Sequence, residues 1–327
     1  MNHIFRSFKT FTKMPILQKI FLILLILVFA LIVINNFNNN TFYITEGFDG
    51  ENILDQNNFF EIKRDQDIYD DFYSQYYDAI FLNKTKNNFE IGKIIDLEKK
   101  NKNTKILDIG CGTGNHVNLL HNKNYEVIGI DQSKHMIKKA KLKYPKCEFI
   151  NSDFIKNDFD YGTFSHILCL GRTIYEIKNK EQFFETCYSL LSYNGFLILN
   201  LSNEKNFKPY ITEQKDKNTL YDSSQYGKTP MSMIVKFTKD MEFISNYENY
   251  VNNETFKNKN APTSNINEKF ENFKTHSIRK NELNLYINPI KDIINSVKSS
   301  GFTFYKKFSM SQVGYDSDYL YVFKKNN

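Results

Sequence analysis

Three glycines and a preceding carboxylate form the densest chemical signal in the chain. In KILDIGCGTG, residues 105–114, Asp108 stands two positions ahead of Gly110, and Gly112 and Gly114 follow at alternate positions. Glycine in such a turn lets the backbone approach a bound ligand without interference from a Cβ atom. The apolar run before the turn predicts a buried strand, so we expect a strand, a ligand-binding turn and then a helix.

The spacing of the glycines separates three kinds of nucleotide site. A P-loop continues with Lys and then Ser or Thr, and neither follows Gly114, so this class is excluded. The dinucleotide fingerprint is G-x-G-x-x-G, whereas Asn115 stands here where the third glycine belongs. A carboxylate at Asp108 would also repel a pyrophosphate. The pattern D-x-G-x-G-x-G is what remains.

Short apolar runs alternate with helical patterns from residue 105 onward. Strands are expected at 105–109, 125–131, 147–150, 165–170 and 195–201, and helices at 115–122, from Ser133 to Ala140, at 181–191 and from Ile290 to Gly301. This alternation is typical of an α/β fold, a Rossmann-like doubly wound sheet that is mostly parallel. Two last strands, 302–308 and 319–325, are expected to form an antiparallel pair at one edge of the sheet. Residues 203–285 interrupt the alternation after the fifth strand, which predicts an antiparallel insertion or lid over the ligand crevice.

The stretch LDIGCGTG resembles motif I of the class I S-adenosylmethionine-dependent methyltransferases, and the resemblance covers residues 68–201. VIGID ends in Asp131, which matches the acidic residue that takes the ribose hydroxyls in that family. In NSDF, Asp153 matches the residue that receives the adenine amino group, and the Phe154 backbone amide would meet the ring. LLSYNGFLILNL resembles the fifth-strand signature, with Asn194 replacing a glycine in a turn conformation that Asn tolerates.

The resemblance implies a methyltransferase with S-adenosyl-L-methionine as its cofactor. The carboxylates of Asp108 and Asp131 suit the cationic amino-acid tail and the hydroxylated sugar of this molecule, which has no phosphate. The residues that the resemblance assigns to the cofactor are Asp108, Gly110, Cys111, Gly112, Gly114, Asp131, Gln132, Asp153, Phe154 and Leu170. Methyl transfer is an in-line displacement that needs chiefly orientation, and a general base only for some acceptors.

The segment DIYDDFYSQYYDAIF, residues 67–81, resembles the opening of small-molecule methyltransferases of the sugar-amine and glycine-type N-methyltransferase kind. That match makes Tyr69, Tyr73 and Tyr77 candidates for the acceptor pocket, where tyrosine faces can stabilise a sulfonium cation. An amphipathic helix that buries its aromatic side chains in the core is an equally open interpretation. No catalytic residue is therefore assigned.

Few other residues are candidates for acceptor chemistry. Tyr175 and Glu176 follow the fourth strand and could face the acceptor, and His276 in the insertion is the one histidine considered as a base. DNA and protein-glutamine methyltransferases carry [ND]-P-P-[YF] after this strand, and its absence weakens the case for nucleic-acid and amide acceptors. The four cysteines have neither CxxC spacing nor a partnering His pair, so no metal site is predicted.

The N-terminal region is typical of a membrane anchor. We expect a basic tail at 1–15, a transmembrane anchor at 16–37, a linker at 38–64 and a methyltransferase domain at 65–327. Within the anchor, residues 20–34 are all apolar, and with their flanks they approach the roughly 20 residues that a spanning helix requires. A cleaved signal peptide and a buried core helix are the alternatives. The first lacks a small-residue cleavage site, and the second would keep a polar stripe.

The charge distribution bears on partners and on orientation. Most of the net charge of +6 comes from Arg6, Lys9, Lys13 and Lys19, which precede the first acidic residue, Glu46. The remaining lysines are scattered rather than gathered in a patch, so nucleic acid is not indicated as a partner. The positive-inside rule puts the domain on the far side of the membrane, whereas the cofactor requires the cytosol. The side that the domain occupies stays open.

We therefore expect a single-pass membrane protein that methylates a small-molecule or lipid-like acceptor. The anchor gives the lipid option weight because it would hold the site at the membrane interface. A catalytically silent, membrane-tethered binding module with the same fold is the main alternative. A dinucleotide oxidoreductase is a third, which Asp108 and the missing third glycine oppose.

Overall fold

A computed structural model describes one folded unit of the chain in detail. The described residues are 60–98, 101, 104–156, 158–204, 207, 219–221, 231–236, 240–249 and 262–326, with positions 15 and 18. The chain divides into two compact units, Met1–Asn52 and Ile53–Asn327, and the fold belongs to the second. Nearly all of the predicted anchor, basic tail and linker lie outside the described residues. No helix within the described ranges is long and apolar enough to cross a membrane.

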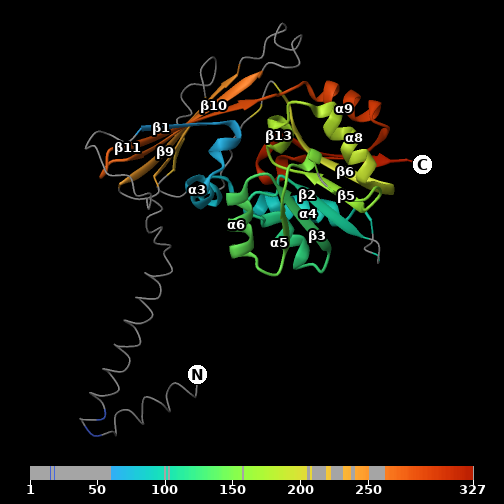
Figure 1. Ribbon diagram of the computed structural model, residues 1–327, viewed down its shortest axis with the longest axis horizontal. Coiled ribbons are helices and arrows are strands. Elements are labelled where there is room, and N and C mark those ends of the chain that lie inside the picture. Colours follow the sequence, from blue (N-terminus) through green and yellow to red (C-terminus); the bar gives the residue numbers. More distant parts are fainter. Residues whose placement is uncertain are drawn as a thin grey trace. The chain divides into compact units, whose positions relative to one another are not determined.

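A seven-stranded sheet in the order β12-β13-β6-β5-β2-β3-β4 forms the centre of this unit (Figure 1). The bounds are β2 Lys105–Ile109, β3 Glu126–Asp131, β4 Glu148–Asn151, β5 Phe164–Cys169, β6 Leu191–Ser202, β12 Phe302–Met310 and β13 Tyr315–Lys325. Strands β2 to β6 pair in parallel, whereas β13 runs antiparallel to β6 and to β12. The predicted Rossmann-like fold class is confirmed. Since the strand order reverses at β2, the ligand crevice belongs at its carboxyl end.

Helices cover both faces of the sheet. Their bounds are α3 Asp71–Phe81, α4 Lys84–Ile95, α5 Asn115–His121, α6 Lys134–Lys143, α7 Thr173–Glu176, α8 Lys180–Leu190 and α9 Ile290–Ser299, with short 3-10 turns η1 Asp65–Ile68, η2 Phe154–Lys156 and η4 Ser311–Val313. Strand β6 shows the burial of both faces, because Leu197 and Leu199 belong to one core cluster while Phe196 and Ile198 belong to the other. Helix α6 begins where predicted, with the Ser133 hydroxyl accepting the Met136 N–H at 3.1 Å.

The predicted insertion forms a second sheet in the order β1-β11-β10-β9-β8-β7. The bounds are β1 Phe60–Arg64, β7 Thr219–Tyr221, β8 Met231–Lys236, β9 Met241–Asn249, β10 Ser264–Asn272 and β11 Ser277–Leu285. Its pairs are antiparallel except for β1, which pairs in parallel with β11. Strand β1 comes from the segment expected to be linker. It is a strand because FEIKR alternates in exposure and pairs with β11 along its length.

Helix α3 links the two sheets. Phe72 and Tyr76 on this helix contact Phe270 of β10, with ring centroids 5.1 and 5.6 Å apart. On another side of the helix, the Tyr77 ring is 3.6 Å from the position that a Cβ atom on Gly112 would occupy. The helix therefore positions residues of the segment before the glycine turn against the predicted ligand site.

Candidate active site

The glycine turn between β2 and α5 needs glycine for two physical reasons. Gly110 and Gly114 have φ angles of +66° and +82°, which L side chains rarely adopt. A Cβ atom on Gly110 would lie 2.6 Å from the Thr173 side chain, and one on Gly114 would lie 2.5 Å from the Phe149 ring. Glycine is therefore needed at these positions for close packing against neighbouring side chains, in addition to the ligand approach that the sequence pattern predicts.

Two pockets adjoin the glycine turn. The α4-side pocket has a volume of about 160 Å³, and its lining includes Lys86, Asn87, Asp108, Cys111, Leu170 and Arg172. The β4-side pocket has a volume of about 150 Å³, and its lining includes Asp131, Gln132, Met136, Asp153 and Phe154. The structure thus gathers the predicted cofactor residues on the two sides of the turn, apart from Gly114, which packs behind it.

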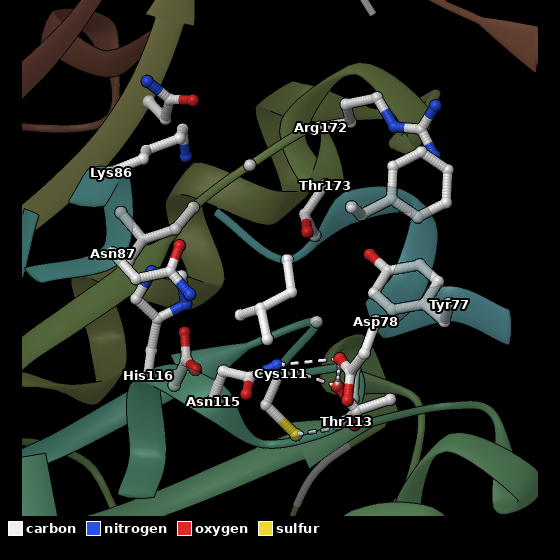
Figure 2. Close-up of a pocket in the computed structure, with 18 of the residues that line it drawn as sticks. Tyr77, Asp78, Lys86, Asn87, Cys111, Thr113, Asn115, His116, Arg172 and Thr173 are labelled. Atoms are coloured by element: carbon white, nitrogen blue, oxygen red, sulfur yellow. Dashed lines mark hydrogen bonds between the residues drawn. The ribbon is translucent and has the colours of Figure 1, made fainter. Parts of the chain in front are cut away.

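Both pockets share Tyr77, Gly110, Gly112, Thr173 and Glu176, which we call the junction. Three of these residues carry a polar side chain, namely Tyr77, Thr173 and Glu176. In Figure 2 the hydroxyls of Tyr77 and Thr173 face the interior of the α4-side pocket. A ligand that spans both pockets must pass the junction.

Asp108 brings a buried carboxylate to the α4-side pocket. The residue is 2% exposed, and its Oδ2 atom has no hydrogen-bond partner in the structure. Burial is the main cause that raises the pKa of Asp108 to about 6; His116 opposes the rise, and Glu90 and Asp131 contribute to it. An unpartnered buried carboxylate oxygen is costly, so this atom is suited to a ligand that supplies a positively charged donor.

Lys86 and His116 line the α4-side pocket opposite Arg172 (Figure 2) and belong to a polar cluster around Glu90 that the sequence patterns did not predict. Glu90 is fully buried, and it pairs with Lys86 Nζ at 2.6 Å and with His116 Nε2 at 2.8 Å. Burial alone would raise the pKa of Glu90, but Lys86 and His116 lower it overall. The i,i+4 spacing of Lys86 and Glu90 was the available signal, although such pairs are usually found on exposed helix faces.

Asp131 ties the glycine turn to the start of α6. Its Oδ2 accepts the Gly112 N–H and its Oδ1 accepts the Ser133 N–H, both at 2.9 Å. Burial raises the pKa of Asp131, and these two hydrogen bonds oppose that rise. In the same pocket, Asp153 Oδ1 accepts the Ile155 N–H at 3.0 Å beside the buried Phe154.

Glu176 of the junction is hydrogen-bonded to a tyrosine. The Tyr69 hydroxyl, from the segment before α3, donates to Glu176 Oε1 at 2.7 Å. Burial raises the pKa of Glu176, while Arg172 opposes the rise, and burial also raises the pKa of Tyr69. A half-buried carboxylate whose pKa is raised is suited to accept a proton from a bound acceptor.

Three sequence candidates lie outside both pockets. Tyr73 is 1% exposed, and its hydroxyl donates to Glu268 Oε1 at 2.9 Å. The buried hydroxyl of Tyr175 accepts the Ser202 N–H at 2.6 Å. His276 is exposed in the turn between β10 and β11. Tyr69 and Tyr77, by contrast, line the β4-side pocket, and Tyr77 lines both pockets.

Among the residues that the structure describes, no group of His, Cys, Asp or Glu could hold a metal ion.

Comparisons with known proteins concern the family and the fold of the chain. The family model described as "Methyltransferase domain" matches residues 100–282, more than half of the chain. Trans-aconitate 2-methyltransferase of Yersinia pestis is 43% identical over 47 residues, which are 14% of this chain and 18% of that protein. The chain therefore matches less than a fifth of the length of this curated relative.

Solved structures show the likeness in fold over most of the chain. The CcbJ methyltransferase from Streptomyces caelestis has a TM-score of 0.59 at 12% identity, covering 79% of this chain and 98% of that one. CalS10 from Micromonospora echinaspora, an amino pentose methyltransferase solved with S-adenosylmethionine bound, has a TM-score of 0.52 at 14% identity. That match covers 78% of this chain and 96% of CalS10.

Proposed function

The chain belongs to the methyltransferase domain family, and from this premise we propose that it transfers the methyl group of S-adenosyl-L-methionine to a small polar molecule. When bound, this cofactor supplies an electrophilic methyl group carried on a sulfonium. The observation that carries the proposal is the unpartnered Oδ2 of Asp108, buried at the edge of the α4-side pocket. A primary ammonium, such as that of the cofactor's amino-acid tail, would satisfy this oxygen, whereas a pyrophosphate would be repelled.

The two pockets divide the cofactor between them. Asp108 and the backbone of the glycine turn would hold the amino-acid tail in the α4-side pocket. Asp131 would take the ribose hydroxyls, and Asp153 with Phe154 would hold the adenine in the β4-side pocket. This division supports methyl transfer at the junction, beside Tyr77, Thr173 and Glu176.

The lining of the α4-side pocket supports a small polar acceptor. Asn200, Ser202 and Asp318 face it from the ends of β6 and β13, and Ser202 Oγ donates to Asp318 Oδ1 at 2.6 Å. Such groups recognise hydroxyls and amines rather than acyl chains. CalS10 is named for an amino pentose, and we propose an amine acceptor here too. Glu176 takes the proton that the acceptor loses on methylation.

Radiolabelled methyl transfer tests this proposal. The full chain is incubated with methyl-labelled S-adenosylmethionine and a cell extract that is then separated into water-soluble small molecules, lipids and macromolecules. We expect label in the water-soluble small molecules, lost with Asp108→Asn and kept with Asp160→Asn, a matched change at an exposed position. Label in lipids alone would contradict the polar acceptor. Cofactor binding without any label would point to the silent binding module.

We further propose that residues 16–37 tether this enzyme to a membrane. The support comes from the sequence, which has an uninterrupted apolar run at 20–34 flanked by basic residues on its N-terminal side. A tethered domain would act on acceptors that are made or consumed near the membrane.

A further inference from the structure

We propose that Arg279, which lines neither pocket, is a positioning residue for Tyr69, the hydrogen-bond partner of Glu176 in the junction. Arg279 lies on β11 of the insertion and is only 6% exposed. Its Nη2 donates to the carbonyl oxygen of Ile68 at 2.9 Å, and its Nη1 donates to Asp70 Oδ2 at 2.7 Å. One guanidinium therefore holds the residue before Tyr69 and the residue after it.

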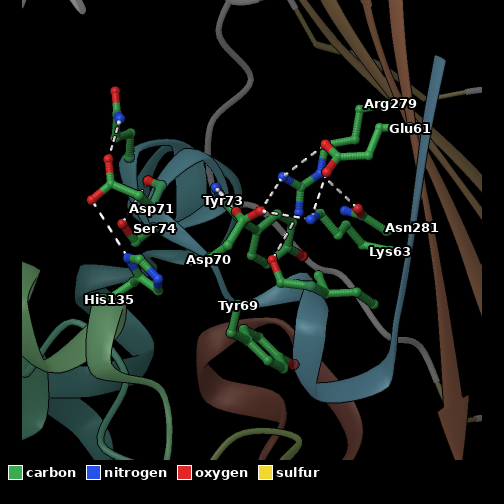
Figure 3. Close-up of polar contacts among 12 residues, drawn as sticks. Glu61, Lys63, Tyr69, Asp70, Asp71, Tyr73, Ser74, His135, Arg279 and Asn281 are labelled. Atoms are coloured by element: carbon green, nitrogen blue, oxygen red, sulfur yellow. Dashed lines mark hydrogen bonds and ion pairs between the residues drawn. The ribbon is translucent and has the colours of Figure 1, made fainter. Parts of the chain in front are cut away.

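The guanidinium is itself fixed by a chain of buried hydrogen bonds, which begins with Asn281 beside it (Figure 3). Its Nε donates to Asn281 Oδ1 at 2.9 Å, and Asn281 Nδ2 donates to Glu268 Oε2 at 2.9 Å. The other carboxyl oxygen of Glu268 accepts the Tyr73 hydroxyl at 2.9 Å. This network joins β10 and β11 to the first turn of α3. A planar fork of donors can serve such a site, whereas the single ammonium of Lys cannot replace it.

Tyr69 connects this network to the active site. Its ring points away from Arg279 in Figure 3, and its hydroxyl donates to Glu176 Oε1 at 2.7 Å. Its carbonyl oxygen accepts the hydroxyl of Ser133, the residue that caps α6. Arg279 thus fixes the backbone on both sides of a residue whose side chain bonds the proposed base. The insertion sheet sets the geometry of the junction rather than only covering it.

A double-mutant cycle between Arg279→Lys and Tyr69→Phe tests this inference, which rests on the proposed function. Each single change should lower kcat/KM for the acceptor about tenfold or more, because each removes a hydrogen bond that involves a charged group. If Arg279 acts through Tyr69, the double variant loses no more than the larger single effect. Loss equal to the product of the two single effects would overturn the inference.

A matched control distinguishes a specific effect of Arg279 from a loss of folding. A second measurement distinguishes failure of this inference from failure of the proposed function. Arg64→Met removes an ion pair of the same sheet, because Arg64 of β1 contacts Glu282 of β11 at 2.8 Å while its side chain is 62% exposed. This variant should keep full activity, and thermal unfolding should show that all variants are folded.

The same double-mutant cycle is repeated with the affinity for S-adenosylhomocysteine as the measured quantity, because Tyr69 lines the β4-side pocket. Coupled losses of affinity support the inference even if the wild-type chain transfers no methyl group, an outcome in which the proposed function alone fails. Independent losses of affinity in the two variants would overturn it.

Discussion

Two carboxylates at this site differ in their hydrogen-bond partners. Asp108 has an oxygen without a partner, whereas the Glu176 oxygen Oε1 accepts a tyrosine hydroxyl. Burial raises the pKa of both groups. The first therefore needs a positive charge from a ligand, and the second is suited to exchange a proton with one.

The pH dependence of cofactor binding should show the effect of Asp108 ionisation on the affinity for S-adenosylmethionine. Its pKa of about 6 in the free protein falls when a cationic ligand binds, so affinity for S-adenosylmethionine should weaken as the pH is lowered through about 6. In Asp108→Asn, affinity should be at least about tenfold weaker at pH 7.5 and flat across this range. Calorimetric titration between pH 5 and pH 8 measures both, and a flat wild-type profile would contradict the assignment.

The same substitution should stabilise the protein without ligand. Because the pKa of Asp108 is higher in the folded than in the unfolded chain, its ionised form destabilises the fold above about pH 6. Asp108→Asn should raise the free energy of unfolding there by about 2 kcal/mol, an advantage that disappears below about pH 4. Chemical denaturation at pH 4 and pH 7.5 measures the difference. A variant less stable than wild type at pH 7.5 would refute the buried unpaired charge.

Glu176→Gln should remove the acid limb of the rate profile. Since a general base must be ionised, wild-type kcat/KM should rise with pH through the raised pKa of Glu176 and then level off. The variant should be slower by about 10²- to 10⁴-fold at neutral pH and should lack this limb. Its affinity for S-adenosylhomocysteine should be unchanged within about threefold. Equal activity of the wild-type chain and the variant would mean that another group accepts the proton.

At this scale, the sequence predicted residues that sit in one contiguous motif and missed pairs that are distant in the chain. Asp108 was predicted because its spacing to the glycines is local. The Tyr69–Glu176 hydrogen bond joins residues 107 positions apart, so no local pattern could contain it. Nothing in the sequence favoured Tyr73 over Tyr77 or the reverse. Their different positions around α3 place the Tyr73 hydroxyl against Glu268 and Tyr77 at the junction.

At the scale of elements, periodicity predicted the strands and helices that position the site. Strands β2, β3 and β5 are buried runs, and α9 carries its apolar residues on one face, with Ile293 and Val297 buried. Strand β1 was missed because FEIKR is short and half polar, and its partner β11 lies some 200 residues further along the chain. Pairing of that kind depends on tertiary contacts rather than on local propensity.

Gly114→Ala should destabilise the protein more than the same substitution at a matched glycine elsewhere in the chain. The new methyl group would lie 2.5 Å from Phe149, in addition to the strain of φ +82°. We expect a loss of about 2 to 4 kcal/mol. Gly314→Ala is the control, because φ is +83° and no atom lies within 4 Å, so only the strain of about 1 kcal/mol applies. Urea denaturation compares them, and equal losses would show that packing contributes nothing.

At the scale of the whole molecule, the two sheets are joined by contacts that no single segment specifies. The bond from Arg279 to Asp70 spans 209 positions, and α3 packs its aromatic rings on the insertion sheet. Composition and alternation predicted a domain with an insertion after the fifth strand. They gave no basis for expecting the insertion to hold Tyr69 through a guanidinium.

The proposed tether should depend on the apolar run near the N-terminus. Arginine near the centre of a spanning helix costs about 3 kcal/mol per residue, so Leu24→Arg combined with Leu27→Arg should move the full chain from the membrane to the soluble fraction. Leu142→Arg is the matched control, since Leu142 is 73% exposed on α6. Carbonate extraction after cell fractionation measures the distribution. A wild-type chain found wholly in the soluble fraction would contradict the tether.

Isothermal titration of the full chain in detergent, with S-adenosylmethionine and with NAD, measures which of these molecules the chain binds. We expect micromolar binding of S-adenosylmethionine, weakened at least about tenfold in Asp108→Asn because the buried side chain then carries no negative charge. We expect no binding of NAD at the same concentrations. Tight binding of NAD with none of S-adenosylmethionine would contradict the assignment of S-adenosylmethionine as the cofactor.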